Sequence, residues 1–136
     1  MHVGAVSLDQ DNFESIAAQD DRVWLVEVGS KFCGSCQAFA PTWEKLITSP
    51  ALQGRVRVGV VVVDDPSGMA LATKLNALSQ GLPAVLLLAR AGAGGKVLMA
   101  GEAHKSKKEL KLAVLAEIDG LSKDSSGLAL KMSGEL

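Results

Sequence analysis

Two cysteines separated by two residues, Cys33-Gly34-Ser35-Cys36, lie where the hydrophobic pattern of the chain changes from that of a strand to that of a helix. Before them, Arg22 to Val28 is rich in β-branched residues and is too short for an ordinary helix. After them, Cys36, Phe39 and Trp43 recur at helical spacing. A dithiol at such a junction restricts the fold strongly, because it requires a buried central strand that leads directly into a helix.

The remaining segments extend this alternation of strands and helices. Strands are predicted at Val3 to Leu8, Arg55 to Val63, Ala84 to Ala89 and Lys96 to Ala100, and helices at Phe13 to Ala17, Ser67 to Leu78 and Ser106 to Asp119. Glycines between Ala91 and Gly95 indicate a hairpin loop, and Ser106 to Glu109 is a capping box. The order β-α-β-α-β-α-β-β-α predicts an α/β fold with a mixed central sheet and helices on both faces.

Length and composition indicate one domain of residues 1–120, followed by a flexible C-terminal tail of residues 121–136 with little periodic signal. The net charge of -1 gives no general attraction for nucleic acid, and no apolar run approaches the roughly 18 residues that span a membrane. Met1 to Gln10 lacks the basic and apolar regions of a secretory signal. A cytoplasmic, reducing location is therefore expected.

The cysteine spacing is typical of a redox-active dithiol. A thiolate at Cys33 would be favoured by the free N–H groups at the start of the helix, and Cys36, one turn later, could attack a mixed disulfide at Cys33. The alternatives are half of a zinc site and two inert buried cysteines. Zinc needs four ligands, and the two histidines, His2 and His104, are at neither of the usual spacings. We therefore expect no metal, and a solvated His104.

The element order and the local sequence resemble the thioredoxin family. The resemblance rests on Trp24 to Val28, on Phe32 to Glu44 with Pro41, and on Leu82-Pro83, and it is especially similar to the catalytic domains of protein disulfide isomerases. It implies a thioredoxin fold from about Val3 to Asp119, thiol–disulfide exchange with protein disulfides, and no cofactor.

The resemblance also implies roles for individual residues. Glu27 corresponds to a buried acid that accepts the proton of Cys36, and Pro83 to a cis-proline that faces the dithiol. Phe32, Leu82 and Pro83 would contact the substrate, and Pro41 would kink the helix. Alternatively, Glu27 faces water at a strand end and Pro83 is an ordinary trans-proline. Trp43 is expected in the core or a groove rather than in catalysis.

The sequence departs from the family at several positions. Phe32 replaces the usual tryptophan, and Gly34-Ser35 contains neither the histidine of disulfide isomerases nor the proline of ordinary thioredoxins. Ala103 stands in the region where isomerases have a mobile arginine. The redox potential and any isomerase activity therefore do not follow from the resemblance.

Two functions fit these features. One is a free disulfide reductase with many client proteins. The other is a subunit of a larger assembly, in which the fold docks to a partner and the dithiol senses local redox state or is not used. In size and solitary architecture the chain is similar to the thioredoxin-like light chains of the flagellar outer dynein arm. That similarity implies a dynein heavy chain as the partner and a location in the flagellar axoneme.

Overall fold

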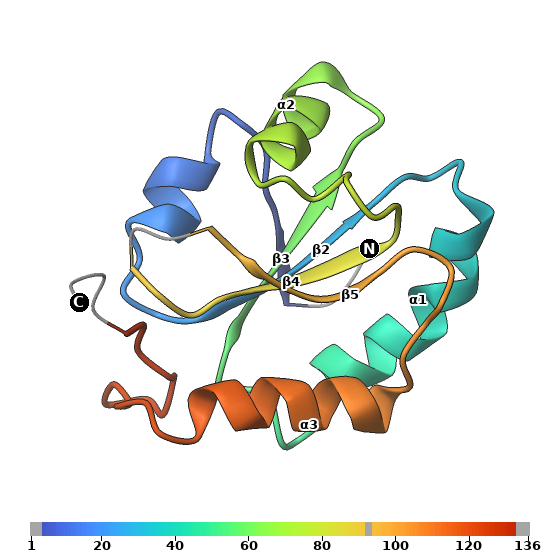
Figure 1. Ribbon diagram of the computed structural model, residues 1–136. Coiled ribbons are helices and arrows are strands. Elements are labelled where there is room, and N and C mark those ends of the chain that lie inside the picture. Colours follow the sequence, from blue (N-terminus) through green and yellow to red (C-terminus); the bar gives the residue numbers. More distant parts are fainter. Residues whose placement is uncertain (1–3, 92–93, 133–136) are drawn as a thin grey trace.

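Five strands form a single mixed sheet in the order β1-β3-β2-β4-β5 (Figure 1). The computed structural model describes residues 4–91 and 94–132. In chain order the elements are β1 (Ala5–Ser7), the π-helix η1 (Glu14–Ala18), β2 (Trp24–Gly29), α1 (Gly34–Ile47), β3 (Arg57–Val62), α2 (Pro66–Lys74), β4 (Ala84–Leu88), β5 (Lys96–Ala100) and α3 (Lys107–Ile118). Strands β1, β3 and β2 are parallel, whereas β4 and β5 pair antiparallel. The predicted α/β order and mixed sheet are confirmed.

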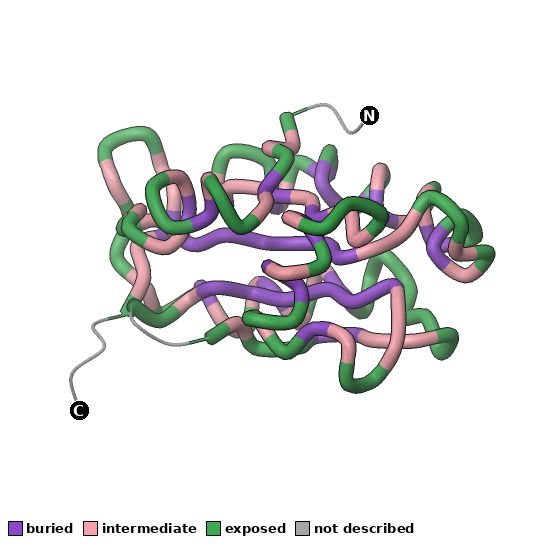
Figure 2. The backbone as a smooth tube through the Cα atoms, turned by 90° about the horizontal axis from the view of Figure 1, so that it is seen from above, coloured by how far each residue is buried: buried purple, intermediate pink, exposed green. Residues whose placement is uncertain are grey.

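Helices cover both faces of the sheet, with α1 and α3 on one face and η1 and α2 on the other (Figure 1). Strand β2 serves both layers because successive side chains of a strand point to opposite faces. Leu25 packs in the core on the α1 side, whereas Trp24 and Val26 pack in the core on the α2 side. Figure 2 shows the resulting buried layer through the middle of the molecule, with exposed residues in the loops.

The element boundaries differ from the predictions at several positions. The predicted helix of Ser67 to Leu78 ends earlier, at Lys74, because Asn76 adopts a left-handed φ of 56° that a helix cannot continue through. The first strand is limited to Ala5–Ser7. Val3 of the predicted strand and residues 92–93 of the predicted hairpin loop lie outside the described residues.

Side-chain caps fix the starts of α2 and α3. The capping box at Ser106 and Glu109 is confirmed, because each side chain accepts a hydrogen bond from the backbone N–H of the other residue. Asp65 caps α2 by accepting a hydrogen bond of 2.7 Å from the N–H of Gly68. None of the helices in the described ranges combines the length and apolarity needed to cross a membrane.

Residues 122–132, which we call the C-terminal strap, pair with the end of the sheet. The N–H of Val23 donates to the carbonyl of Ala129 at 2.9 Å, and the N–H of Ala129 donates to the carbonyl of Arg55 at 2.8 Å. Met132 similarly donates to the carbonyl of Ala89. The predicted flexible tail is therefore wrong for this segment, since distant backbone partners fix it; residues 133–136 of that tail lie outside the described residues.

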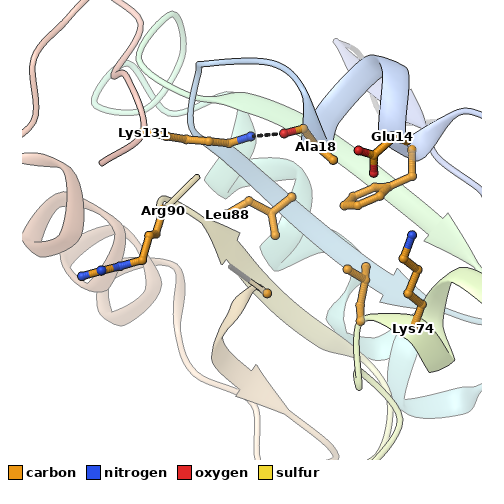
Figure 3. A pocket seen from close by; sticks show the side chains of 9 residues that line it. Glu14, Ala18, Lys74, Leu88, Arg90 and Lys131 are labelled. Atoms are coloured by element: carbon orange, nitrogen blue, oxygen red, sulfur yellow. Dashed lines mark hydrogen bonds between the residues drawn. The ribbon is translucent and has the colours of Figure 1, made fainter. Parts of the chain in front are cut away.

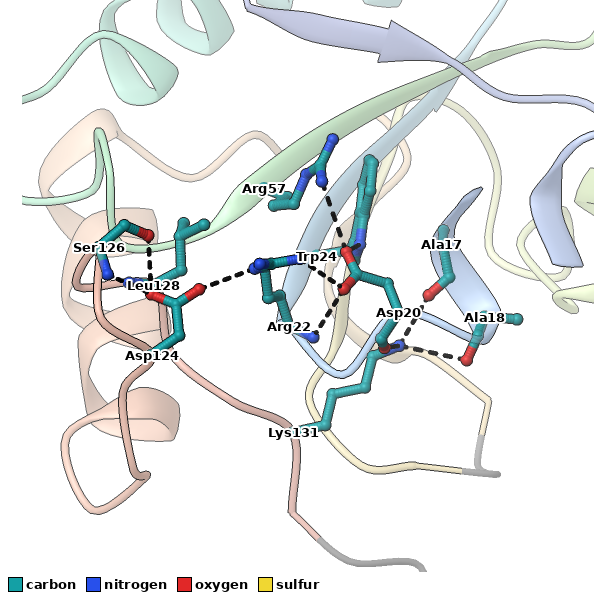
Figure 4. A network of polar contacts seen from close by, with 10 residues as sticks. All are labelled: Ala17, Ala18, Asp20, Arg22, Trp24, Arg57, Asp124, Ser126, Leu128 and Lys131. Carbon is teal, nitrogen blue, oxygen red and sulfur yellow. Dashed lines mark hydrogen bonds and ion pairs between the residues drawn. The ribbon is translucent and has the colours of Figure 1, made fainter. Parts of the chain in front are cut away.

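Side chains reinforce the C-terminal strap (Figure 4). Asp124 accepts a hydrogen bond of 2.8 Å from Nε of Arg22. The ammonium group of Lys131 donates to the carbonyls of Ala17 at 2.8 Å and Asp20 at 2.7 Å, where the chain leaves η1. The strap thus connects the end of α3, the start of β2 and the end of η1.

Candidate functional site

Cys33 is the N-cap residue of α1. Its backbone is extended, with φ −90° and ψ 114°, and its sulfur accepts a hydrogen bond of 3.1 Å from the N–H of Cys36. The thiol is partly exposed and both cysteines are free. A sulfur in this position lies among the unpaired N–H groups at the positive end of the helix dipole, which favours a negative charge there. Cys33 is therefore the better placed of the two thiols to react with an external disulfide.

The loop in front of Cys33 is held by Asp64, which follows β3. One carboxylate oxygen of Asp64 accepts a hydrogen bond from the hydroxyl of Ser30, and the other accepts one of 2.8 Å from the N–H of Lys31. These hydrogen bonds lower the pKa of Asp64, the Ser30 bond contributing most. Phe32, which follows directly, projects into solvent with 87% of its surface exposed. The fixed loop thus presents an aromatic side chain next to the reactive thiol.

Cys36 is buried against the end of β2. A Cβ atom at Gly29 would lie 3.3 Å from the sulfur of Cys36, so glycine at this position leaves the space that the thiol occupies. Burial raises the pKa of the Cys36 thiol to about 11, with a further contribution from its hydrogen bond to Cys33. At neutral pH Cys36 is therefore protonated and needs a base before it can act as a nucleophile.

Glu27 lies beneath α1 in the middle of the sheet. Alternation along β2 turns its side chain to the same face as Leu25, which is the face covered by α1. The side chain is only 7% exposed, so the alternative of a water-facing glutamate is wrong. Burial, followed by the negative charge of Glu44, raises the pKa of Glu27 to about 7. A carboxyl group with this pKa can both accept and release a proton near neutral pH.

A cavity of about 260 Å³ lies beside both buried groups and is lined by Glu27 and Cys36 together with Gly29, Gln37 and Val60. The carboxyl group of Glu27 and the thiol of Cys36 therefore border the same cavity. Water in a cavity of this kind can carry a proton between groups that line it. The arrangement can therefore couple loss of the Cys36 proton to protonation of Glu27.

Leu82 and Pro83 lie at the same end of the sheet as the dithiol. Antiparallel pairing of β2 with β4 puts Ala84 opposite Val28, so Pro83 starts β4 where β2 leads toward Cys33. The Leu82–Pro83 peptide bond is cis, and the alternative of an ordinary trans-proline is therefore wrong. The substrate contacts expected for Phe32, Leu82 and Pro83 stay predictions.

Two further predicted residues have structural positions. Trp43 is fully buried in the core beside Phe39, which confirms the core assignment for this residue. Pro41 lies within α1 and faces solvent, and the helix continues past it to Ile47. Neither residue lines the cavity beside Glu27 and Cys36.

His104 makes two contacts that the sequence did not predict. It is exposed, as expected, yet its Nε2 lies 2.7 Å from the hydroxyl oxygen of Ser35, between the two cysteines, and its ring packs edge-on against Phe39. Asp64 is the other residue that sequence reasoning missed. The aspartate pair after the valine run indicates only where that strand ends, and nothing in its sequence indicates a contact with the loop before Cys33.

The described residues contain no candidate metal site. Within residues 4–91 and 94–132, no three His, Cys, Asp or Glu side chains gather closely enough to hold a metal ion.

A second cavity, of about 350 Å³, lies at the opposite end of β4, between η1, α2 and the C-terminal strap. It is lined by Glu14, Lys74, Arg90 and Lys131 (Figure 3). It contains none of the predicted site residues.

Comparisons with known proteins agree with this architecture. The family described as Thioredoxin matches residues 4–117. The chain is 32% identical over 115 residues to the protein disulfide-isomerase A6 homolog of Drosophila melanogaster, covering 85% of this chain and 24% of the relative. It is 41% identical over 59 residues to protein disulfide-isomerase A6 of Homo sapiens, covering 43% of this chain and 13% of the relative.

A solved structure, the J-Trx1 fragment of ERdj5, has the same fold with a TM-score of 0.66 and 19% sequence identity; the match covers 86% of this chain and 53% of that one. The fold and the dithiol define a thioredoxin-type domain. The chain belongs to the thioredoxin family. It spans about a quarter of the length of the Drosophila relative and about an eighth of the human one.

Proposed function

We propose that this chain exchanges its dithiol with disulfides of protein substrates. The observation that carries the proposal is the pairing of an accessible Cys33 at the start of α1 with a buried Cys36, whose N–H bonds the Cys33 sulfur at 3.1 Å. The cysteine pair of a thioredoxin family domain supports this chemistry.

In the first step, the Cys33 thiolate attacks one sulfur of the substrate disulfide. A bond forms between Cys33 and that sulfur, the substrate disulfide breaks, and the other substrate sulfur leaves as a thiolate. In the second step, Cys36 loses its proton to Glu27 and attacks the sulfur of Cys33. This releases the second substrate thiolate, which takes up a proton. The substrate gains two electrons, and the chain ends as a Cys33–Cys36 disulfide.

The raised pKa values of Cys36 and Glu27 support this division of roles. Cys36, with a pKa of about 11, stays protonated while Cys33 reacts, and so does not compete for the external disulfide. Glu27, with a pKa of about 7, is half ionised at neutral pH and can take the proton at the second step. An external thiol reductant must then reduce the Cys33–Cys36 disulfide before the next cycle.

The first test is turnover of insulin disulfides with dithiothreitol as the reductant. We expect the wild-type chain to accelerate precipitation of the reduced insulin chains, and Cys33→Ala to lose at least about 100-fold of that rate, because the nucleophile is absent. The free energy of unfolding of Cys33→Ala should lie within about 1 kcal/mol of the wild-type value. Equal rates for the wild type and Cys33→Ala would contradict the proposal.

A second test separates a free enzyme from a fixed subunit. Cys36→Ala, which cannot resolve a mixed disulfide, serves as bait in an extract of the source cells, with the double variant Cys33→Ala/Cys36→Ala as the control. Several proteins eluted by dithiothreitol from the single variant alone support exchange with many substrates. One large partner that stays bound in dithiothreitol and elutes from both variants only in denaturant would instead favour a docking subunit, such as one on a dynein heavy chain.

A further inference from the structure

We propose that His104 is a positioning residue for the dithiol, and that protonation of its imidazole ring increases the reactivity of Cys33 through its hydrogen bond to Ser35. The inference rests on the proposed function, since it concerns the same thiol. It assigns a role to a residue that is 69 positions from its partner in the chain.

Two contacts hold the imidazole ring of His104 in place. Its Nε2 is 2.7 Å from Oγ of Ser35, and its ring centroid is 5.2 Å from that of Phe39, with 63° between the planes. Phe39 is fully buried in the core, so the ring rests against a rigid surface. The imidazole is therefore held against one side of the first turns of α1.

The loop that carries His104 is also fixed on both sides. The N–H of His104 donates to the carbonyl of Glu102 at 3.0 Å, and the N–H of Lys105 lies 3.3 Å from the sulfur of Met99. The capping box at Ser106 follows at once and starts α3. A ring held by its own loop and by α1 loses little additional freedom when it bonds Ser35.

The position of Ser35 explains how its contact with His104 affects Cys33. Ser35 lies in the first turn of α1, the turn that Cys33 caps. A neutral imidazole exchanges only a hydrogen bond with Ser35, whereas an imidazolium adds a positive charge beside the helix end where the Cys33 thiolate forms. Positive charge there favours the thiolate, which is the reactive form of a cysteine.

Histidine changes its charge between about pH 5 and pH 8, so the effect depends on pH. The ring should accelerate reactions of Cys33 when it is protonated and have no such effect when it is neutral. Other ionisable side chains lie on the same elements: Cys33 and Cys36 on α1, Glu102 and Lys105 on the loop, and Lys107, Lys108 and Glu109 in the first turn of α3. Glu27, which lines the cavity beside Cys36 and has a pKa raised to about 7, is kept in every variant, so its titration affects all of them equally.

The test measures alkylation of Cys33 by iodoacetamide from pH 5.5 to pH 8.5. All variants carry Cys36→Ala, which leaves Cys33 as the only thiol of the chain. His104→Gln keeps a side chain that can bond Ser35 but cannot become charged. We expect His104→Gln to slow alkylation about two- to fivefold at pH 6, and the two rates to converge at pH 8.5.

Two more variants show whether Ser35 mediates the effect. Ser35→Ala should produce the same loss at pH 6, and adding His104→Gln to it should produce no further loss, because the ring is no longer held against α1. Lys105→Ala is the matched control, since it removes a positive charge one residue along the loop, on a side chain close to Glu109. We expect it to leave the pH profile unchanged.

Three results would overturn the inference: equal rates for His104→Gln and its parent at every pH, a loss that is the same at pH 6 and pH 8.5, or an equal loss in Lys105→Ala. These outcomes are distinct from failure of the proposed function. That failure would appear as absence of insulin reduction by the wild-type chain, whereas an active chain with an unchanged His104→Gln profile contradicts the role of His104 alone.

Discussion

At the scale of single residues, the burial of the Glu27 carboxyl group lowers the stability of the folded chain. Its side chain is 7% exposed, and burial raises its pKa to about 7. An unfolded glutamate ionises at the ordinary value near 4.5, so the folded chain binds more protons than the unfolded chain between these two values. The free energy of unfolding should therefore fall as the pH rises from about 4.5, and the loss should be complete above about pH 7.

Replacing Glu27 by glutamine tests this consequence. The amide side chain cannot ionise, so Glu27→Gln should gain about 2–3 kcal/mol relative to the wild type between pH 4.5 and pH 8. Urea unfolding at several pH values measures the difference. Glu14→Gln, at an exposed position of η1, is the matched control and should show no such gain. A constant difference between Glu27→Gln and the wild type across this range would show that Glu27 titrates normally.

Residue types in the local sequence were sufficient to predict most residues of this site. The cysteine spacing predicted the positions of Cys33 and Cys36, and a lone acid in an apolar strand predicted the burial of Glu27 once the family resemblance was added. The contact of His104 with Ser35 was not predictable, because a histidine in a polar loop carries no pattern that indicates its partner. Asp64 was missed for the same reason, although it holds the loop before Cys33.

At the scale of elements, α2 can pack closely against β3 because Gly68 has no side chain. A Cβ atom at Gly68 would lie 1.8 Å from the carbonyl oxygen of Val62, which is a backbone atom and cannot rotate away. The first turn of α2 therefore lies directly against the end of β3. The same loop carries Asp64, so this close packing also supports the position of the carboxylate that holds Ser30 and Lys31.

Gly68→Ala should accordingly destabilise the chain. Because α2 has to move away from β3, we expect a loss of about 2 kcal/mol or more in the free energy of unfolding. Urea unfolding measures this loss, with Gly120→Ala as the control, since a Cβ atom there meets nothing within 4 Å. Wild-type stability in Gly68→Ala would mean that the helix does not pack this closely in solution.

Periodicity predicted the type and order of the elements better than their ends. The valine run predicted β3, and the apolar spacing after Ser106 predicted α3, because both patterns are repeated over a whole element. The end of α2 was wrong by several residues, since the left-handed Asn76 interrupts an apolar spacing that continues to Leu78. A single backbone angle of this kind leaves the hydrophobic pattern unchanged.

At the scale of the whole molecule, the C-terminal strap joins segments that are far apart in the chain. Its hydrogen bonds reach Arg55 and Ala89, and Lys131 donates to carbonyls at the end of η1. The sequence of the strap is polar and aperiodic, which led to the incorrect prediction of a flexible tail. Its order comes from backbone and side-chain partners in distant parts of the chain, and local patterns do not record such partners.

Lys131→Met tests the contribution of the strap. Methionine keeps the apolar part of the side chain but leaves the carbonyls of Ala17 and Asp20 without this donor, so we expect a loss of about 1–3 kcal/mol. Lys123→Met, at an exposed position of the same strap, should change stability by less than about 0.5 kcal/mol. Equal urea midpoints for both variants would indicate that the hydrogen bonds of Lys131 contribute nothing measurable.

The strap also determines where the domain can be held without disturbing its chemistry. Met132 is paired with Ala89 and Ala91, beyond the end of β4 that lies opposite Pro83 and the cysteines. A bead, a fluorophore or a solid support joined after residue 132 would therefore be attached at the end of the sheet opposite Phe32 and Cys33. Pulling or imaging experiments on single molecules could use this anchoring point while large disulfide-containing proteins still approach the thiol freely.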